Sequence, residues 1–596
     1  MSRTIFRALV SFATLAIISG SSIAGAQEPK PRPLETALVG PATFLIPGIG
    51  TVEGVLSAAD AARYKRITEL HENGDWRAAQ PIIKRLNDRR LMGHVLALKY
   101  LHPTKYRSRF TELRDWLQDY ADHPQARRIH RLAVLRQPKG ARAPAPPIVH
   151  TPTVRGASVK TASEGRPLYD RAKTRAGRSA HSEILRRVSR GWPTGAREII
   201  TSQRATQNMG PVQIAQAWRA IGQGYFRAGK DEQALEAAMA SHAASPGDAP
   251  LAYWWGGLAA WRLGKKDEAE TLFGELARAG RASDSLIAAG AFWAARASLS
   301  NEHPESVTQY LEIGAQHARS FYGLLSHRAI GDTDSFGWRK PDLSLAAFHD
   351  IAGNKIGSRA IALLQISRKH DAERELLSLS AATPALRDDV LALASHAGLP
   401  AVALKLSSHA AADVRLTAAY PVPSWKPESG YSIDQALVLA FVRQESAFNR
   451  RAESSAGARG LMQLMPRTAS YVGGERALHG RGKYRLYEPD LNLELGQRYI
   501  QQLLTHKNIS GDLFRLAAAY NAGPGNLRSW ERAFEHGDDP LLFIESLPSR
   551  ETRKFVEHIL TNLWIYRSQL GQAAPSLDDI VAGRWPEYRP QDSHGR

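Results

Sequence analysis

The chain has 596 residues, which implies several domains because one hydrophobic core rarely grows beyond about 250–300 residues. It carries 78 Lys and Arg against 58 Asp and Glu, a net charge of +20, and it has no cysteine. The lack of cysteine excludes disulfides, thiolate metal sites and a lipid-attachment cysteine. The basic balance favours an acidic polymer as partner. Nucleic acid is a poor candidate for that polymer, because the sequence holds no nucleic-acid-binding motif.

The first 26 residues have the pattern of an export signal. Arg3 and Arg7 precede a short apolar core, and Ala24–Ala26 offers a small-residue cleavage site. The apolar core is too short to span a bilayer, and no other stretch approaches the ~18 apolar residues that a span requires. We therefore expect cleavage near Ala26, no stable membrane span afterwards, and a location outside the cytoplasm, most simply the periplasm.

Two segments without helical periodicity divide the rest of the chain. Helical patterns are expected within residues 27–136, and the basic, proline-rich stretch 137–180 predicts a flexible linker or an extended insert. Three prolines within Pro421–Pro427 cannot continue a helix, so a domain boundary is expected at about residue 420.

Between residues 181 and 420 the sequence contains an internal repeat. Gly222, residues 225–230 and Ala234 recur 35 residues later as Gly257, residues 260–265 and Ala269. This period is typical of stacked helix–turn–helix repeats of the tetratricopeptide type. The pattern predicts an α-solenoid; an ordinary repeat scaffold that binds a protein partner is the alternative. The tryptophans of these helices are expected in the core rather than on sugar-stacking surfaces: Trp192, Trp218, Trp254, Trp255, Trp261 and Trp293.

An acidic residue interrupts an apolar stripe beyond the boundary. Residues 432–446 read as one helix that begins with a capping box of Ser432 and Gln435. Glu445 continues the buried stripe of this helix, which also contains Ile433, Leu437, Phe441 and Phe448. A carboxyl group that loses hydration has a raised pKa, and a carboxylic acid still protonated near neutral pH can act as a general acid. The alternative is a structural ion pair with Arg443, Arg450 or Arg459.

Three further motifs follow Glu445-Ser446 in order: the Gly-Leu-Met-Gln run 460–463, the Ala-Tyr-Asn-Ala-Gly run 519–523, and Glu-Thr-Arg at 551–553. With these four motifs the segment Pro421–Leu570 resembles the catalytic domain of the soluble lytic transglycosylases, lysozyme-like enzymes that cut bacterial peptidoglycan. The resemblance implies an all-α protein. It would consist of a tetratricopeptide-like superhelix over 181–420, closing into a ring, a lysozyme-like domain over 421–575, and a C-terminal tail over 576–596.

The resemblance also implies an activity and a set of site residues. Glu445 would protonate the β-1,4 bond between N-acetylmuramic acid and N-acetylglucosamine and then deprotonate the C6 hydroxyl, which closes into a 1,6-anhydromuramoyl end. Substrate-binding positions carried over from the family are Ser454, Gln463, Met465, Tyr520, Asn521 and Glu551. Gln463 is otherwise a satisfied buried amide, Tyr520 a core residue, and Glu551 an ion-pair partner of Arg553. The family has an aromatic residue before Glu-Thr-Arg, where this chain has Pro548-Ser549-Arg550.

The resemblance also indicates binding partners, and the sequence leaves two other functions open. Peptidoglycan glycan strands are the expected partner, and other proteins of cell-wall synthesis or remodelling are compatible with it. No cofactor is expected, and His479, His506 and His536 form no metal-ligand pattern. A goose-type lysozyme-like hydrolase stays open, with Glu453, Glu475, Glu488 or Asp490 as its second acid. A non-catalytic wall-binding scaffold is a third reading.

Overall fold

The computed structural model describes residues 41–150, 174–332, 336–533 and 536–592. Within these ranges the chain forms 29 α-helices and one two-stranded antiparallel sheet, which confirms the all-α class. The expected export signal and the middle of the expected linker, residues 151–173, lie outside the described residues. None of the described helices combines the length and apolarity that crossing a membrane would need.

The N-terminal region begins with a β-hairpin of β1 (Pro41–Ile46) and β2 (Gly50–Ser57). Five helices follow: α1 (Ala58–Asn73), α2 (Trp76–Lys84), α3 (Met92–Tyr100), α4 (Phe110–Asp119) and α5 (Ala126–Leu135). The hairpin and α1 pack on a helix distant in sequence, α17 (Lys355–Gln365), where the Gln365 side chain accepts hydrogen bonds from the N–H groups of Val55 and Leu56, each at 3.0 Å. This region therefore caps the far end of the superhelix.

The superhelix consists of paired helices in two stretches. The first contains α6 (Arg175–Ser189), α7 (Pro193–Ile200), α8 (Gln203–Asn208), α9 (Pro211–Arg227), α10 (Asp231–Ala244), α11 (Leu251–Arg262), α12 (Lys266–Ala277), α13 (Asp284–Ser300), α14 (Pro304–Ala315) and α15 (Phe321–Ala329). The second contains α16 (Leu345–Gly353), α17, α18 (Lys369–Ala382), α19 (Arg387–His396), α20 (Pro400–Leu406) and α21 (Ala412–Ala419).

The structure confirms the helix–turn–helix nature of the repeat. Helices α9 and α11 end 35 residues apart, at Arg227 and Arg262, and each is followed by a glycine in the left-handed region, Gly229 with φ 67° and Gly264 with φ 73°. Ala234 and Ala269 are fully buried at the next helix crossing. Of the six tryptophans expected in the core, Trp254, Trp255 and Trp293 are buried and Trp218 and Trp261 are half-buried, whereas Trp192 is 51% exposed.

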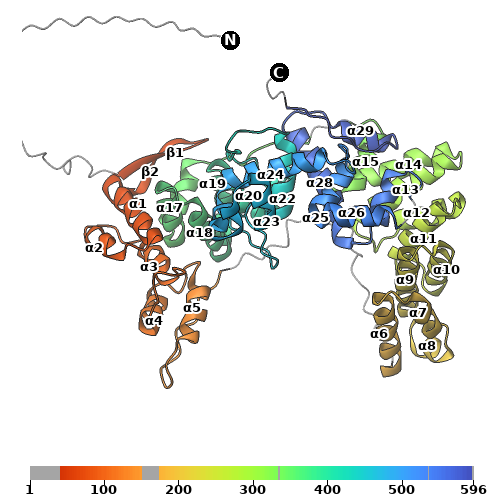
Figure 1. Ribbon diagram of the computed structural model, residues 1–596, viewed down its shortest axis with the longest axis horizontal. Helices are drawn as coiled ribbons and strands as arrows, with labels where there is room; N and C mark the ends of the chain where they lie inside the picture. Colours follow the sequence, from red (N-terminus) through yellow and green to blue (C-terminus); the bar gives the residue numbers. More distant parts are fainter. Residues whose placement is uncertain (1–40, 151–173, 333–335, 534–535, 593–596) are drawn as a thin grey trace, which may run out of the picture.

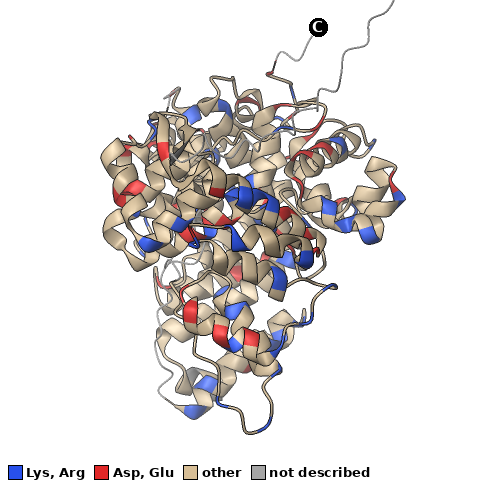
Figure 2. Ribbon diagram, turned by 90° about the vertical axis from the view of Figure 1, so that its left-hand side faces the viewer, with Lys and Arg blue, Asp and Glu red and all other residues tan. Residues whose placement is uncertain are grey.

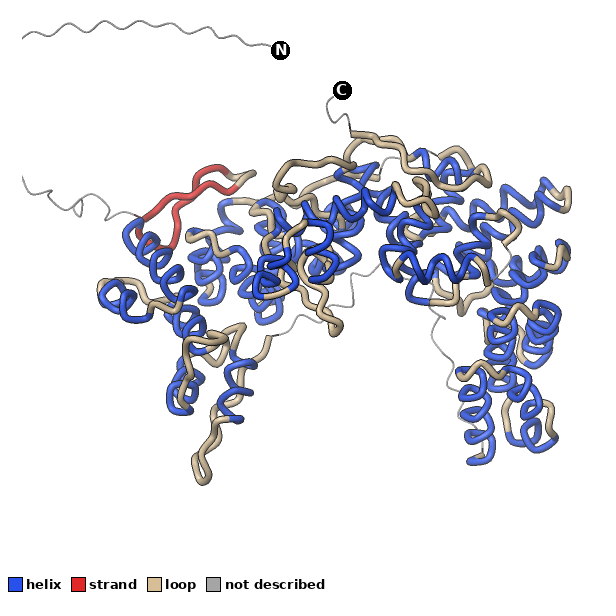
Figure 3. Tube along the Cα trace, in the orientation of Figure 1, coloured by secondary structure: helices blue, strands red, loops and turns tan. Residues whose placement is uncertain are grey.

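In Figure 1 the helices form an arch whose two arms point to the same side. Helices α1–α5 make one arm and α6–α8 the end of the other, and the C-terminal helices lie between them (Figures 1 and 3). Figure 2 shows Lys and Arg spread over every part of the molecule in that view, with Asp and Glu between them. The net charge is therefore not gathered into a single patch on that side.

The C-terminal domain follows a non-helical boundary at residues 420–434, as the prolines predict. Its helices are α22 (Gln435–Ser446), α23 (Pro466–Gly473), α24 (Pro489–Leu504), α25 (Leu513–Ala522), α26 (Pro524–Glu531), α27 (Pro540–Ser546), α28 (Arg550–Gln569) and α29 (Pro575–Val581). Phe321 of α15 stacks on Trp564 of α28 at a centroid distance of 5.4 Å, so this domain and the first superhelical stretch share one core.

Residues 576–592 do not form the expected tail. The Tyr588 N–H donates to the Gly511 carbonyl at 2.8 Å, and the Leu513 N–H donates to the Pro586 carbonyl at the same distance. Further on, the N–H groups of Gln591 and Asp592 donate to the buried Asp434 carboxylate at the start of α22. The segment is therefore part of the C-terminal domain, and it covers the N-terminus of its central helix.

Candidate active site around Glu445

Helix α22 is buried on all sides over most of its length. The predicted stripe of Ile433, Leu437, Phe441 and Phe448 is buried, but so is every residue from Ala436 to Arg443. The predicted capping box is wrong, because the helix begins at Gln435 and the Ser432 N–H donates to the Gln497 side chain at 3.0 Å. Glu445 is the penultimate residue of the helix, and it is half-buried where the core opens to solvent.

The chain turns sharply after Glu445. Ala447 and Phe448 adopt φ values of 48° and 63°, a left-handed conformation that costs about 1–2 kcal/mol per residue for side chains other than glycine. Phe448 is fully buried, so its packing holds this turn in place. As a result the helix ends directly behind Glu445, and the carboxyl group lies at its open end.

The environment of Glu445 favours its protonated form. Burial and, to a smaller extent, the negative charge of Glu551 together raise the pKa of Glu445 to about 8. Within the described chain, no hydrogen bond or ion pair joins the Glu445 side chain to another residue. Arg443 instead donates to the Asn562 side chain and the Ala419 carbonyl, each at 2.9 Å, and Arg459 pairs with Glu453. The structural ion pair considered for Glu445 is thus absent from the described residues.

The loop after α22 carries three of the predicted binding residues. The half-buried Ser454 hydroxyl oxygen accepts a hydrogen bond from the Ala458 N–H at 3.0 Å. The Gln463 amide donates to the carbonyls of Ala452 (3.2 Å) and Gly460 (2.9 Å), so its donor side braces the loop. Met465 is 40% exposed at the start of α23.

Two residues that sequence reasoning missed hold this loop. The Asn492 side chain of α24 is fully buried; it accepts a hydrogen bond from the Met462 N–H at 2.8 Å and donates to the carbonyls of Arg459 and Leu486. Gly496 lies one turn further, where a Cβ would stand only 2.0 Å from the Met462 sulfur. An asparagine on the otherwise apolar side of a helix was the available signal.

Tyr520 of α25 brings the four motifs together. Its hydroxyl donates to the Met462 carbonyl of the second motif at 2.8 Å, and its ring lies 4.5 Å from that of Phe441 in the first-motif helix. On the other side it stacks on Phe555, just after the fourth motif, at 6.3 Å and 10°. Burial and then the charge of Glu445 raise the Tyr520 pKa well above its ordinary value, so the phenol keeps its proton.

The fourth motif lies in the first turn of α28. Glu551 is exposed, and Thr552 beside it donates to the Asn521 side chain at 2.8 Å, which joins the third and fourth motifs. The alternative interpretation of Glu551, an ion pair with Arg553, is wrong, because the Arg553 guanidinium is buried and donates to the Leu547 carbonyl on another face of the helix.

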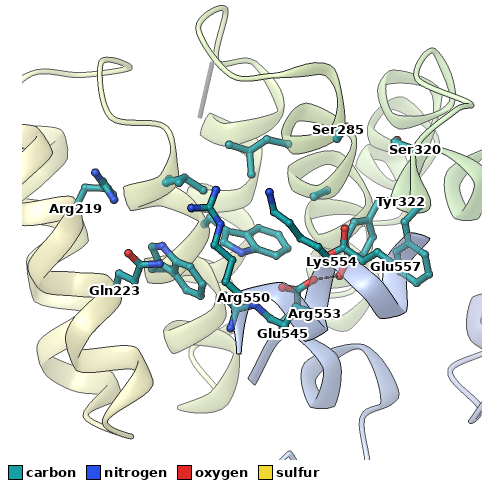
Figure 4. Close-up of a pocket in the computed structure, with 16 residues that line it drawn as sticks. Arg219, Gln223, Ser285, Ser320, Tyr322, Glu545, Arg550, Arg553, Lys554 and Glu557 are labelled. Carbon is teal, nitrogen blue, oxygen red and sulfur yellow. Dashed lines mark hydrogen bonds between the residues drawn. The ribbon is translucent and has the colours of Figure 1, made fainter. Parts of the chain in front are cut away.

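That other face of α28 lines a cavity of about 200 Å³ against helices α9, α11, α13 and α15 (Figure 4). Arg219, Arg550 and Lys554 approach it from two sides, and burial followed by the charge of Arg550 lowers the Lys554 pKa. Burial raises the pKa of both Glu545 and Glu557, that of Glu557 to about 8, so this pair holds a proton near neutral pH. The cavity is therefore predominantly cationic.

One group of side chains in the described chain has the composition of a metal site: His94, His123 and Glu375. Both Glu375 oxygens are already bound by Arg359, at 2.9 Å each. The His123 Nδ1 accepts a hydrogen bond from the Gln125 N–H, so a neutral His123 carries its proton on Nε2 and has no free lone pair for an ion. This arrangement fits an ion-pair network and does not fit a cation.

Comparison with known proteins adds an independent observation. Residues 424–543 match the family described as the transglycosylase SLT domain. The chain is 36% identical over 151 residues to the soluble lytic murein transglycosylase of Salmonella typhimurium, and 34% identical over 157 residues to that of Escherichia coli K12. These alignments cover 25% and 26% of this chain and 23% and 24% of the relatives, so sequence similarity spans about a quarter of their length.

Comparison with solved structures extends the similarity from the C-terminal domain to the superhelix. The 70 kDa soluble lytic transglycosylase SLT70 of Escherichia coli superposes with a TM-score of 0.52 at 17% identity, covering 89% of this chain and 99% of that one. Residues 424–543 are thus similar to the transglycosylase SLT domain, and the fold of the chain is similar to that of SLT70. The Slt transglycosylase of Pseudomonas aeruginosa gives a TM-score of 0.53 at 20% identity over 90% of this chain and 88% of the other. The SLT match ends at residue 543, so α28 and Glu551 lie beyond it.

Proposed function

We propose that this protein is a soluble lytic transglycosylase, which cleaves the β-1,4 bond between N-acetylmuramic acid and N-acetylglucosamine in peptidoglycan and forms 1,6-anhydromuramoyl ends. The observation that carries the proposal is Glu445, a half-buried carboxyl with a pKa of about 8 and no ion-pair partner in the described chain, at the meeting point of four family motifs. At neutral pH such a group is a carboxylic acid that can donate its proton.

The reaction proceeds in two proton transfers through Glu445. Its proton passes to the bridging oxygen as the bond from C1 to that oxygen breaks. The resulting carboxylate removes the proton from the C6 hydroxyl of the same muramoyl residue, and O6 forms a bond to C1. Glu445 thereby recovers its proton and no water is consumed. An internal hydroxyl competes well with solvent because it is held close to the reacting carbon.

The other predicted residues would position the sugar. Ser454 and Met465 lie on the exposed side of the loop, where a hydroxyl and a thioether can contact a sugar ring. Gln463, Tyr520 and Asn521 act largely by holding the motifs together, since their polar groups bond to neighbouring loops and helices. Glu551 adds to the effect of burial in raising the Glu445 pKa, and its exposed side chain is available to a substrate.

The cationic cavity next to α28 suits the acidic part of peptidoglycan. Peptide stems carry carboxylates, and Arg219, Arg550 and Lys554 surround a space on the neighbouring face of the helix that carries Glu551. We expect the stem to extend from the muramoyl residue toward this cavity. Peptidoglycan also explains the exported, periplasmic location expected from the first 26 residues.

A lysozyme-like hydrolase is the second candidate, and Glu551 is the observation that favours it. Two of the four acids considered from the sequence for holding water already have partners: Glu453 is bound by Arg459 and Tyr487, and Glu475 by Arg485. Glu551 was not among those four, but it is the carboxylate whose charge raises the Glu445 pKa. The non-catalytic scaffold is disfavoured because the acidic centre and its bracing contacts are intact.

Mass spectrometry of digested sacculi tests the proposal. The full chain should release muropeptides with anhydro ends, while Glu445→Gln, which keeps the shape of the side chain, should release none. The Pseudomonas relative has been solved as a mutant described as inactive, in which glutamate is replaced by glutamine. Reducing ends would instead establish the hydrolase, and unchanged activity of E445Q would remove Glu445 from the mechanism. Glu69→Gln, at the exposed ion pair with Arg66 in α1, is the matched control.

A further inference from the structure

A second cavity lies at the junction between superhelix and C-terminal domain, away from Glu445. Its volume is about 310 Å³, at the lower end of the ~300–1,000 Å³ typical of small-molecule sites. Its walls come from helices α19–α21, the coil before α16, the linker 421–423 and the end of α28. Gln569 lies 18 residues after Glu551 on α28, about 27 Å along the helix axis at 1.5 Å per residue. The cavity is therefore separate from the site around Glu445.

Three residues that line this cavity carry buried polar atoms without hydrogen-bond partners among the described residues. They are the indole nitrogen of Trp338, the hydroxyl of Thr417 and the side-chain oxygen of Gln569. Thr417 itself is only 9% exposed. Leaving a buried polar group unpaired costs about 1–3 kcal/mol, so three around one space point to an occupant that pairs them.

The polar and apolar groups that line the cavity indicate which kind of ligand it would bind. An indole N–H requires an acceptor, an amide oxygen requires a donor, and a hydroxyl serves as either. Between them lie apolar surfaces of Leu399, Ala403 and the linker prolines, and among the described residues Lys340 is the only charged one that lines the cavity. An acetamido group matches this arrangement, since it offers one carbonyl, one N–H and one methyl group without charge.

We propose that this cavity binds the acetamido group of an N-acetylated hexosamine, as a second glycan site at the domain junction. The choice of a sugar among neutral amides rests on the proposed function, because every residue of a peptidoglycan strand carries this group. An occupant would contact both the superhelix and the start of the C-terminal domain. It would thus hold one part of a glycan strand while another part lies at Glu445.

Fluorine NMR of the full-length chain labelled with fluorotryptophan tests this site. The Trp338 resonance is assigned with Trp338→Phe, and the titration uses E445Q so that the catalytic residue plays no part. N-acetylglucosamine should shift this resonance saturably, and glucose, which lacks the acetamido group, should not. Thr417→Val removes one hydrogen bond and should weaken binding roughly tenfold. Because it replaces an unpaired hydroxyl by a methyl group of the same shape, the variant should fold normally.

Ser395→Ala is the matched control, since Ser395 lines the same cavity but its hydroxyl already donates to the Leu391 carbonyl at 2.8 Å. It should bind like the parent protein. The proposal is overturned if N-acetylglucosamine gives no saturable shift, if glucose acts equally, or if T417V and S395A behave alike; the cavity would then hold water only. Failure of the proposed function appears separately, as the absence of anhydro ends from wild-type digests.

Discussion

The Tyr520 hydroxyl donates a hydrogen bond to the Met462 carbonyl at 2.8 Å, and this single contact ties the third family motif to the second. The same ring lies against Phe441 and Phe555, which belong to the helices of the first and fourth motifs. Segments up to 114 residues apart in the chain, from Phe441 to Phe555, are thus held around one phenol. The loop that carries Ser454 and Gln463 depends on it for its position.

Tyr520→Phe should therefore affect positioning more than folding. The ring contacts remain, and the loss of one hydrogen bond costs on the order of 1 kcal/mol, with the Met462 carbonyl left unpaired. We expect kcat/KM on a soluble glycan chain to fall roughly tenfold and the pH profile to keep its shape. Tyr471→Phe, at an 80% exposed residue of α23, is the control. A profile moved along the pH axis would assign Tyr520 a direct part in the proton transfers.

The pH dependence should report Glu445 directly. Its acid form is needed for bond cleavage and its pKa is about 8, so kcat/KM should decline on the alkaline side with a midpoint near that value. Glu551→Gln removes the repulsion that contributes to the raised pKa, and the midpoint should move to lower pH. Burial, the larger cause, remains, so the midpoint should stay above the ordinary value of 4.5. Rates measured at fixed ionic strength separate this effect from attraction of substrate to the basic surface. Activity that is flat to pH ~9 would contradict the assignment.

Glu445 should also make stability depend on pH. Between pH 4.5, its ordinary pKa, and about 8, the folded state keeps a proton that the unfolded state has lost. Stability therefore falls as pH rises through this window and levels off above it. Glu445→Gln removes the effect, so the variant should equal the wild type at pH 4 and exceed it at pH 8. The difference should be on the order of 1–3 kcal/mol, because solvent exposure reduces the full effect of the shift. Denaturant unfolding at the two pH values measures it, and equal gains at both would contradict it.

The buried pair of Asp434 and Arg567 should contribute strongly to the stability of the C-terminal domain. Both side chains are fully buried, and the guanidinium donates to the carboxylate at 2.8 Å. Arg567→Met leaves Asp434 charged without its partner and should destabilise the domain by about 3–5 kcal/mol. Adding Asp434→Asn should recover part of this loss. Arg485→Met, at an exposed pair, should cost less than about 1 kcal/mol in the same denaturation experiment.

The sequence correctly predicted the features that depend on regular spacing of residues along the chain. The 35-residue repeat, the proline boundary and the apolar stripe of α22 all recur in the structure, because local spacing determines which residues share a helix face. The raised pKa of Glu445 followed from its position on that stripe.

Features that depend on long-range packing were not predictable in this way. The Ser432 capping box failed because Gln497, 65 residues later, binds the Ser432 N–H. An ion pair of Arg553 with Glu551 was one of the two interpretations left open. Helix geometry places the two residues on different faces of α28, and the guanidinium donates to the Leu547 carbonyl instead. Residues 586–592 contain one large apolar residue, Tyr588, so nothing local indicated that backbone N–H groups there would bind Asp434.

The contacts of the C-terminal domain determine which fragment around Glu445 could be produced on its own. A fragment cut to the SLT match at residues 424–543 would lose α28, and with it Glu551, Phe555 and Arg567. Extending the fragment to Asp592 restores the segment that covers Asp434. Even then, Trp564 would lose Phe321 and Glu545 would lose the Tyr322 hydroxyl. An excised domain would therefore expose an apolar face and aggregate unless that face were redesigned.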